Sequence, residues 1–246
     1  MTLDEVLASL FGDRFTVDER PDGILLGEGR LPGAQNVSLI GVVHGKPLGI
    51  EGALTLAQRV LALVRAGQRQ PILVLLDSDS QRMSRRDELL GLNEYLSHLA
   101  KALSAADQAG FATISLLYGG GAAGAFVATA LATRALIALP GAKPAVMDMP
   151  SISRVTKLPI EMLERMSAST PVFAPGLANM QAMGAVTETW NPNHSLRDQL
   201  SSLLQRVDEL PADNRDRVGQ QQGGRMKAAA IADKVMQQAL RSPVAR

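Results

Sequence analysis

Residues 111–124 read FATISLLYGGGAAG, and this stretch decides the fold. Phe111 to Leu117 is a short apolar run with β-branched residues, which predicts a buried strand of a parallel sheet. From Ala122 onward the residues are small or apolar on every side, which predicts a helix that is buried all round. A strand that passes through glycine into such a helix leaves backbone N–H groups unpaired at its positive end. We therefore predict that the main chain can bind a negative charge here.

Three interpretations of the glycine-rich segment remain open from these residues alone. The amides could form an oxyanion hole, or the glycines could only let the strand and helix pack closely. Gly119-x-Gly121-x-x-Gly124 also fits the dinucleotide fingerprint, which requires the first βα turn and an acidic residue about 20 positions on. Here the segment lies mid-chain, and another apolar run precedes the acidic candidate, Asp148.

Composition limits the function classes. With 25 Lys and Arg against 24 Asp and Glu, the net charge is +1, which gives no reason to expect nucleic acid. Hydrophobic residues make up 46% of the chain and aromatic residues 3%, as is usual where helices pack on a sheet. Without cysteine there are no disulfides and no thiolate chemistry. His44, His98 and His194 lack metal-ligand spacing, so we expect no metal site and local or solvent-facing roles for them.

We expect a protein of the cytoplasm without membrane contact. The N-terminal residues Met-Thr-Leu-Asp-Glu-Val are acidic and lack a signal or transit pattern. No apolar run reaches the ~18–20 residues that span a bilayer, and Arg134 interrupts the apolar segment after Ala122.

Alternating strands and helices predict an α/β fold. No linker or repeat divides the chain, so we expect one domain over residues 1–246, with a core at about 37–190, a polar stretch at 213–224 and a C-terminal helical extension at about 195–241. The expected elements are a helix at 1–11, a hairpin within 15–33, a strand at 37–43, a helix at 50–66, a strand at 72–76, a helix at 86–109, the strand and helix of the opening stretch, strands at 135–139 and 145–147, a loop at 148–154, a helix at 160–167, a strand start at 184–186, and helices at 196–207 and 226–240.

Three segments, in this order, resemble the carboxytransferase branch of the crotonase superfamily. Gly49-Ile50-Glu51-Gly52-Ala53 is similar to its Pro-Glu-Gly helix start, and Leu76-Asp77-Ser78-Asp79-Ser80 to its Asp-Thr-Pro-Gly turn. Tyr118 to Ala125 is similar to its Gly-Glu-Gly-Gly-Ser-Gly-Gly-Ala segment. The resemblance implies a crotonase-like (ClpP/crotonase) fold with repeated ββα units. It also implies that two backbone N–H groups stabilise a thioester enolate.

Other segments depart from that pattern and narrow the resemblance. Asp79 and Ser80 replace the proline and glycine of the turn. Tyr-Gly-Gly-Gly-Ala-Ala-Gly-Ala-Phe at 118–126, with Pro-Ser-Ile-Ser-Arg-Val-Thr at 150–156, most resembles the gamma-subunit family of biotin-independent malonate decarboxylases. The resemblance implies a malonyl thioester on the phosphopantetheine-type arm of an acyl carrier protein, and no cofactor bound by this chain. It also implies a heterodimer with a homologous beta subunit, and allows an acyltransferase subunit as a further partner.

Decarboxylation of a malonyl thioester places negative charge on the thioester oxygen, which fixed N–H donors stabilise. We expect the first donor to be the amide of Gly121 or Ala122, with Gly120 setting its geometry. The second is expected at Ser80 or Gln81. Tyr118 and Ala123 are expected to contact the substrate. Arg154 could pair with its carboxylate, or could simply lie at the surface. Arg82, Arg85 and Arg86 could contact the phosphate or acidic surface of the carrier, or could simply form a solvated helix start.

Asp77 and Asp79 follow a strand two residues apart, so their side chains point the same way. We expect them to cap the next turn, with a paired acid/base role as the alternative. Ser78, Ser80 and Ser151 lack the context of an activated nucleophile. Three other functions also remain open. They are an alpha-type half of a biotin-dependent acyl-CoA carboxyltransferase, a non-catalytic scaffold subunit, and a nucleotide-dependent oxidoreductase.

Overall fold

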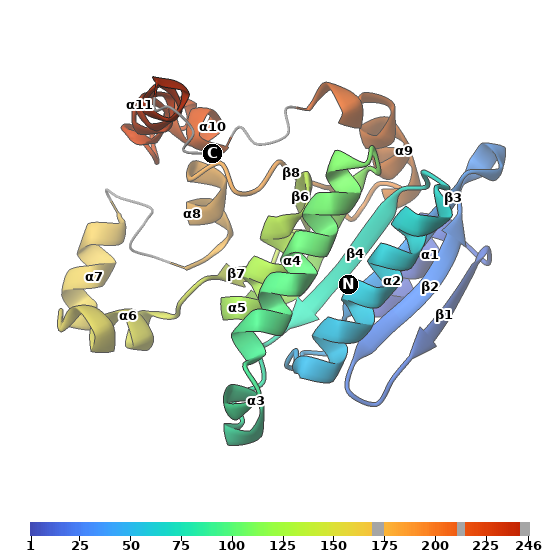
Figure 1. The fold of residues 1–246 in the computed structure, drawn as a ribbon, viewed down its shortest axis with the longest axis horizontal. Helices are drawn as coiled ribbons and strands as arrows, with labels where there is room; N and C mark the ends of the chain where they lie inside the picture. The colour runs from blue at the N-terminus through green and yellow to red at the C-terminus, as the bar shows by residue number, and fades with distance from the viewer. Residues whose placement is uncertain (169–174, 211–214, 242–246) are drawn as a thin grey trace.

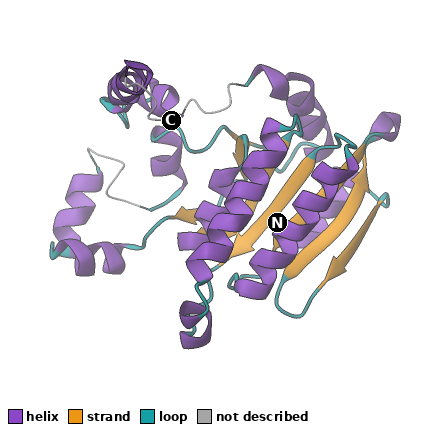
Figure 2. Ribbon diagram, in the orientation of Figure 1, coloured by secondary structure: helices purple, strands orange, loops and turns teal. Residues whose placement is uncertain are grey.

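Helices cover both faces of one twisted sheet in the computed structural model of the chain (Figures 1 and 2). The structure describes residues 1–168, 175–210 and 215–241. Within these residues eight strands form the sheet in the order β1-β2-β3-β4-β5-β6-β8, and β7 pairs with β5 beyond the end of β6. The strands are β1 (Phe15–Glu19), β2 (Ile24–Arg30), β3 (Asn36–Val42), β4 (Ile72–Ser78), β5 (Thr113–Ala122), β6 (Ala135–Ala138), β7 (Lys143–Ala145) and β8 (Glu188–Thr189).

The sheet is mixed. β1, β2 and β3 form an antiparallel meander, which includes the expected hairpin, and every later pairing is parallel. Parallel neighbours need a crossover, and helices supply it between β3, β4 and β5. The carboxyl ends of these three strands therefore lie at one edge of the sheet.

Two helix pairs bury the faces of the sheet. α2 and α4 pack side by side over one face, and α1 and α9 over the other (Figure 1). The α-helices are α1 (Leu3–Phe11), α2 (Ile50–Ala66), α3 (Arg85–Leu89), α4 (Leu92–Gln108), α5 (Ala123–Ala128), α6 (Met149–Thr156), α7 (Ile160–Ser167), α8 (Leu177–Ala182), α9 (Leu196–Arg206), α10 (Arg215–Gln221) and α11 (Ala228–Arg241). Short 3₁₀ turns are η1 (Pro32–Ala34), η2 (Ala130–Ala132) and η4 (Val207–Glu209).

The periodic helices form as predicted because their ends carry clear signals. Thr2 and Glu5 make a reciprocal capping box at the start of α1. α2 occupies the predicted residues and ends at Gly67, which is in the left-handed conformation. The structure likewise confirms the helices expected at 160–167, 196–207 and 226–240, to within two residues at each end.

The single long helix predicted at 86–109 is wrong. The segment is two helices, α3 and α4, separated at Leu90 and Gly91. Gly91 has φ +79°, a left-handed conformation that the middle of a right-handed helix cannot contain. The break leaves Leu89 and Leu90 exposed.

The prediction of a turn at the glycine-rich segment is also wrong. β5 continues through Gly119, Gly120 and Gly121 to Ala122, and α5 starts only at Ala123. The long buried helix expected after it is one six-residue helix followed by η2. Thr129 interrupts it, with its hydroxyl donating to the carbonyl of Ala125 at 2.6 Å.

Three later segments differ from expectation. The loop expected at 148–154 is helix α6, because the Asp148 carboxylate accepts the amide of Ser151 and caps the helix. The strand start expected at 184–186 is a turn with φ +75° at Gly184, and β8 begins at Glu188. Part of the polar stretch at 213–224 is helix α10, while residues 213 and 214 lie outside the described residues. None of the described helices is both long and apolar enough to span a bilayer.

Candidate active site

Two loops and the junction of β5 with α5 meet where β3, β4 and β5 end, the edge at which open parallel sheets bind ligands. Backbone hydrogen bonds join the two loops. The amide of Gly45 donates to the Asp77 carbonyl at 2.9 Å, and that of Leu48 to the Ser80 carbonyl at 2.9 Å. The amide of Arg82 returns to the Leu48 carbonyl at 2.8 Å. Residues 45–48 therefore fix the course of residues 77–82.

Asp77 connects the end of β4 to the glycine run. Its carboxylate oxygen Oδ1 accepts the Gly120 amide at 2.7 Å. A Cβ atom on Gly119 would lie 2.1 Å from the same oxygen, and one on Gly121 would lie 2.7 Å from Leu117 Cδ1. Gly119 and Gly121 must therefore be glycines, because the strand backbone lies against the side chains of Asp77 and Leu117. This supports the close-packing interpretation for these two residues. Asp77 bonds across to β5 instead of capping its own turn, which corrects the expectation from the sequence.

The predicted amide donors lie at the end of a strand. Gly121 is flanked by Ser78 of β4 and Pro144 of β7, and Ala122 by Ala145. The chain leaves the sheet at Ala123, which has φ +51°, an uncommon conformation for a residue with a side chain. Ala122, Ala123 and Gly124 are half-buried, so the junction of β5 and α5 reaches the surface.

Gln81 connects the second loop to this junction. Its side-chain oxygen Oε1 accepts the amide of Gly124 in the first turn of α5 at 2.8 Å. The hydroxyl of Ser80 donates to the Gln81 carbonyl at 2.8 Å, and that of Ser78 to the Lys46 carbonyl at 2.8 Å. These bonds hold the two segments in which the sequence predicts donors next to each other.

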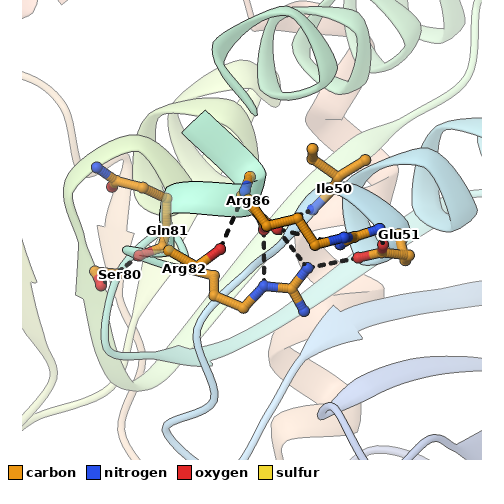
Figure 3. Close-up of polar contacts among 8 residues, drawn as sticks. Ile50, Glu51, Ser80, Gln81, Arg82 and Arg86 are labelled. Carbon is orange, nitrogen blue, oxygen red and sulfur yellow. Dashed lines mark hydrogen bonds and ion pairs between the residues drawn. The ribbon is translucent and has the colours of Figure 1, made fainter. Parts of the chain in front are cut away.

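Four charged side chains anchor the Ser80–Gln81 loop to the start of α2, and Figure 3 labels three of them, Glu51, Arg82 and Arg86. Arg82 lies 2.7 Å from Asp87, from Nε to Oδ2, and 2.5 Å from Glu51, from Nη2 to Oε2. Arg86 contacts the other oxygen of Glu51 at 2.6 Å. A Cβ atom on Gly49 would lie 2.3 Å from Arg82 Cζ, so glycine there lets the guanidinium lie against the helix start.

The cluster shifts the pKa of each of its members. Hydrogen bonds from Arg86 and Arg82 lower the pKa of Glu51 from 4.5 to about 2. The hydrogen bond from Arg82 lowers the pKa of Asp87, although burial of that carboxylate opposes the change. Hydrogen bonds to the acids raise the pKa of both arginines. Two acids therefore compensate the charges of Arg82 and Arg86, whereas Arg85 makes no ion pair within the described residues.

Two of the predicted substrate contacts lie away from the junction of β5 and α5. Tyr118 is buried in the core under α1 and α9, and burial, followed by the charges of Asp77 and Glu19, raises the pKa of its hydroxyl. Arg154 lies exposed on α6, which packs with α7 away from the sheet (Figure 1). Ala123 is at the junction, as predicted.

The other predicted side chains have structural roles. Asp148, the acidic candidate of the dinucleotide fingerprint, caps α6, and the amides of Gly120 and Gly124 already bond side chains. His44 contacts Glu19 at 2.7 Å, as expected for a locally satisfied residue, and His98 and His194 are exposed. Across the described ranges, no group of three or more His, Asp or Glu side chains is arranged to hold a metal ion.

Sequence reasoning missed the side-chain roles of Asp77, Gln81 and Asp87. One local signal exists for Asp87, because Ser84 caps α3 by accepting its amide. The Asp77 and Gln81 contacts each join residues 43 positions apart. No local pattern predicts such pairs.

The sequence model of the malonate decarboxylase gamma subunit matches residues 43–239. The chain belongs to this family. A relative from Malonomonas rubra, the malonyl-S-ACP:biotin-protein carboxyltransferase MADD, is 28% identical over 214 residues, which cover 78% of this chain and 73% of the relative. The family match confirms the resemblance drawn from residues 118–126 and 150–156.

Solved structures show the same fold. A Pseudomonas malonate decarboxylase hetero-tetramer in complex with coenzyme A matches with a TM-score of 0.77 and 24% identity over 95% of this chain and 98% of that one. The Pseudomonas MdcD-MdcE hetero-dimer matches with a TM-score of 0.73 and 23% identity over 96% and 98%. The transcarboxylase 12S core matches with a TM-score of 0.68 and 18% identity over 87% of this chain and 42% of that one. The crotonase-like α/β fold is confirmed.

Replacing Gly119 with alanine should destabilise the chain by about 1–3 kcal/mol, the usual cost of overpacking. The new Cβ would force Asp77 away from the Gly120 amide. Urea unfolding measures the change. Gly120→Ala is the matched control and should lose less, because its Cβ would meet its nearest atom, the Ser78 carbonyl oxygen, at 3.1 Å, a tight contact but a much longer one than 2.1 Å. Equal losses in both variants would contradict the close-approach argument.

Glu51 should make stability fall in acid. Its pKa in the folded chain lies below its ordinary value, so its ion pairs stabilise the fold above about pH 4.5 and are lost as the pH falls toward 2. Glu51→Gln should flatten the pH dependence of the urea midpoint between pH 6 and pH 3. Exposure of Glu51 keeps the effect small. Glu161→Gln, on α7 outside the cluster, should leave the slope unchanged, and an unchanged slope in Glu51→Gln would reject the assignment.

Proposed function

We propose that this chain and a homologous beta subunit form the site that decarboxylates a malonyl thioester carried by an acyl carrier protein. The observation that carries the proposal is the hydrogen bond from the Gly124 amide to Gln81 Oε1. It brings the loop after β4 and the junction of β5 and α5 together at one sheet edge. Membership of the gamma-subunit family and the MdcD-MdcE hetero-dimer of the Pseudomonas enzyme support the same assignment.

In the reaction the bond between the carboxylate carbon and C2 of the malonyl group breaks and CO2 leaves. The electron pair of that bond passes into the thioester as an enolate with its charge on oxygen. A proton from water then reaches C2 and gives the acetyl thioester. Preorganised N–H donors stabilise the enolate oxygen, and loss of one such donor typically costs about 3 kcal/mol.

The expected donor Gly121 is excluded, because its β7 partner Pro144 has no N–H and the pairing therefore uses the Gly121 amide itself. The donors in this proposal come from Ala122 at the end of β5 and from Ser80 or Gln81 after β4. Gly120 has the positioning role, because Asp77 already occupies its amide. Ala123 offers a small apolar surface at the junction. Tyr118 and Arg154 take no part, since the first is buried under α1 and α9 and the second lies on α6.

Exposed apolar side chains on both sides of this edge support a covering partner. Met83 and Leu89 follow β4 with relative exposures of 76% each, and Val146 and Met147 follow β7 with 48% and 41%. Contiguous exposed apolar side chains are characteristic of binding surfaces, and in this proposal these residues belong to one such surface. Arg85 is exposed beside them, makes no ion pair within the described residues, and would face the phosphate of the phosphopantetheine-type arm or the acidic carrier.

The chain alone should not decarboxylate malonyl-carrier protein, because it supplies half of the site. Addition of the beta subunit should restore turnover, measured as CO2 release. Leu89→Glu should weaken assembly at least tenfold, since a charge would be buried in the interface, whereas Met226→Glu, also at an exposed methionine, should not. Full turnover by the chain alone would reject the shared site.

A second candidate is transfer of the carboxyl group to biotin. The observation that favours it is the relative from Malonomonas rubra, which is named a malonyl-S-ACP:biotin-protein carboxyltransferase. The two functions differ in the need for an acceptor. We expect turnover of the assembled complex without biotin and without inhibition by avidin. A strict requirement for a biotinylated protein would favour the transferase.

A further inference from the structure

We infer that the side-chain amide nitrogen of Gln81 is a catalytic donor that contacts an oxygen of the malonyl thioester. This inference rests on the proposed function and adds a side-chain donor to the backbone donors proposed above. It follows from the orientation of the carboxamide, from the state of its N–H groups and from the rigidity of the loop that carries it.

The Gly124 amide fixes the orientation of the Gln81 carboxamide. A backbone N–H requires an acceptor, and only the oxygen of a carboxamide can accept. The 2.8 Å contact therefore places Oε1 toward α5 and turns Nε2 to the opposite side. The Gln81 side chain extends away from the arginine cluster (Figure 3).

The N–H groups of Gln81 remain open to a ligand. Nε2 lies 3.5 Å from Met83 Sδ, a weak thioether acceptor on an exposed side chain. No other hydrogen bond from Nε2 occurs within the described residues. Gln199 provides the contrast. Its Oε1 also accepts a backbone amide, from Asn191 at 2.9 Å, but its Nε2 is taken up by backbone carbonyls, including that of Asn191 at 3.0 Å.

The loop holds this donor rigidly. Ser80 Oγ binds the Gln81 carbonyl, the Leu48 backbone pairs with the loop on both sides of Gln81, and Arg82 is held by the buried carboxylate of Asp87. A donor that is already in position when negative charge develops on the thioester oxygen lowers the activation barrier, because the protein does not have to reorganise. Because Gln81 is only half-buried, the donor is also accessible from the surface.

Gln81→Glu tests the inference in the complex with the beta subunit, using malonyl-carrier protein as substrate. Glutamate keeps the acceptor for Gly124 but replaces the donor with a carboxylate oxygen. We expect kcat/KM to fall by about 10²–10³ at pH 7.5, the usual effect of losing one oxyanion donor. A loss in kcat would assign the contact to the thioester oxygen, which gains charge in the transition state. A rise in KM would assign it to the carboxylate of the malonyl group, which loses its charge there.

The pH profile separates catalysis from structure. A protonated glutamate donates a hydrogen bond, so the ratio of Gln81→Glu to wild-type activity should rise about tenfold for each pH unit lowered, down to the pKa of the introduced group. Gln81→Met, which has neither group, should lose activity without this dependence. The slope is measured within one preparation, so partial unfolding of a variant does not remove it.

Gln199→Glu is the matched control and should retain activity within threefold. Gln81→Glu activity within threefold of wild type, or a ratio that does not change with pH, overturns the inference while the proposed function stands. Failure of the wild-type complex to release CO2 would instead reject the proposed function, and this inference with it.

Discussion

The hydrogen bond between the Asp77 carboxylate and the Gly120 amide is the contact on which the rest of the site depends. It joins the ends of β4 and β5 at 2.7 Å, and it can form only because Gly119 has no side chain to displace the carboxylate. With it in place, β5 continues beyond β6 and takes β7 as its neighbour. The glycine run thus extends the central strand, and the turn into α5 falls at Ala123.

That extension moves the candidate donors from a loop onto the sheet. A segment flanked by β4 and β7 is more rigid than a surface turn, and rigid elements hold donors in place with less loss of order on binding. The loop after β4 reaches comparable rigidity by other means. Two backbone bonds to Leu48 and the ion pairs of Arg82 anchor it to α2, and Gln81 then joins it to α5.

Much of this architecture follows from local signals in the sequence. Apolar runs and caps predict β3, α2 and α9, and the order of motifs predicts the family and its crotonase-like fold. The glycine run was misplaced because a glycine-rich segment between strand and helix has the same local pattern whether it turns or extends. The contact that makes the segment extend is the hydrogen bond to the carboxylate of Asp77, which lies 43 residues before Gly120. A contact between residues so far apart produces no periodic pattern in the sequence.

The charge balance of the arginine cluster also bears on catalysis. Arg82 and Arg86 meet Glu51 and Asp87, so the loop after β4 is anchored by ion pairs without a net positive charge. An uncompensated arginine next to the substrate would bind the malonyl carboxylate most strongly before CO2 leaves, and that stabilisation of the ground state would raise the barrier. Neutral N–H donors aimed at the thioester oxygen instead bind more strongly as the enolate forms. A rigid edge at which Arg82 and Arg86 are compensated by ion pairs therefore suits decarboxylation better than the fully cationic surface that the three arginines predict from the sequence.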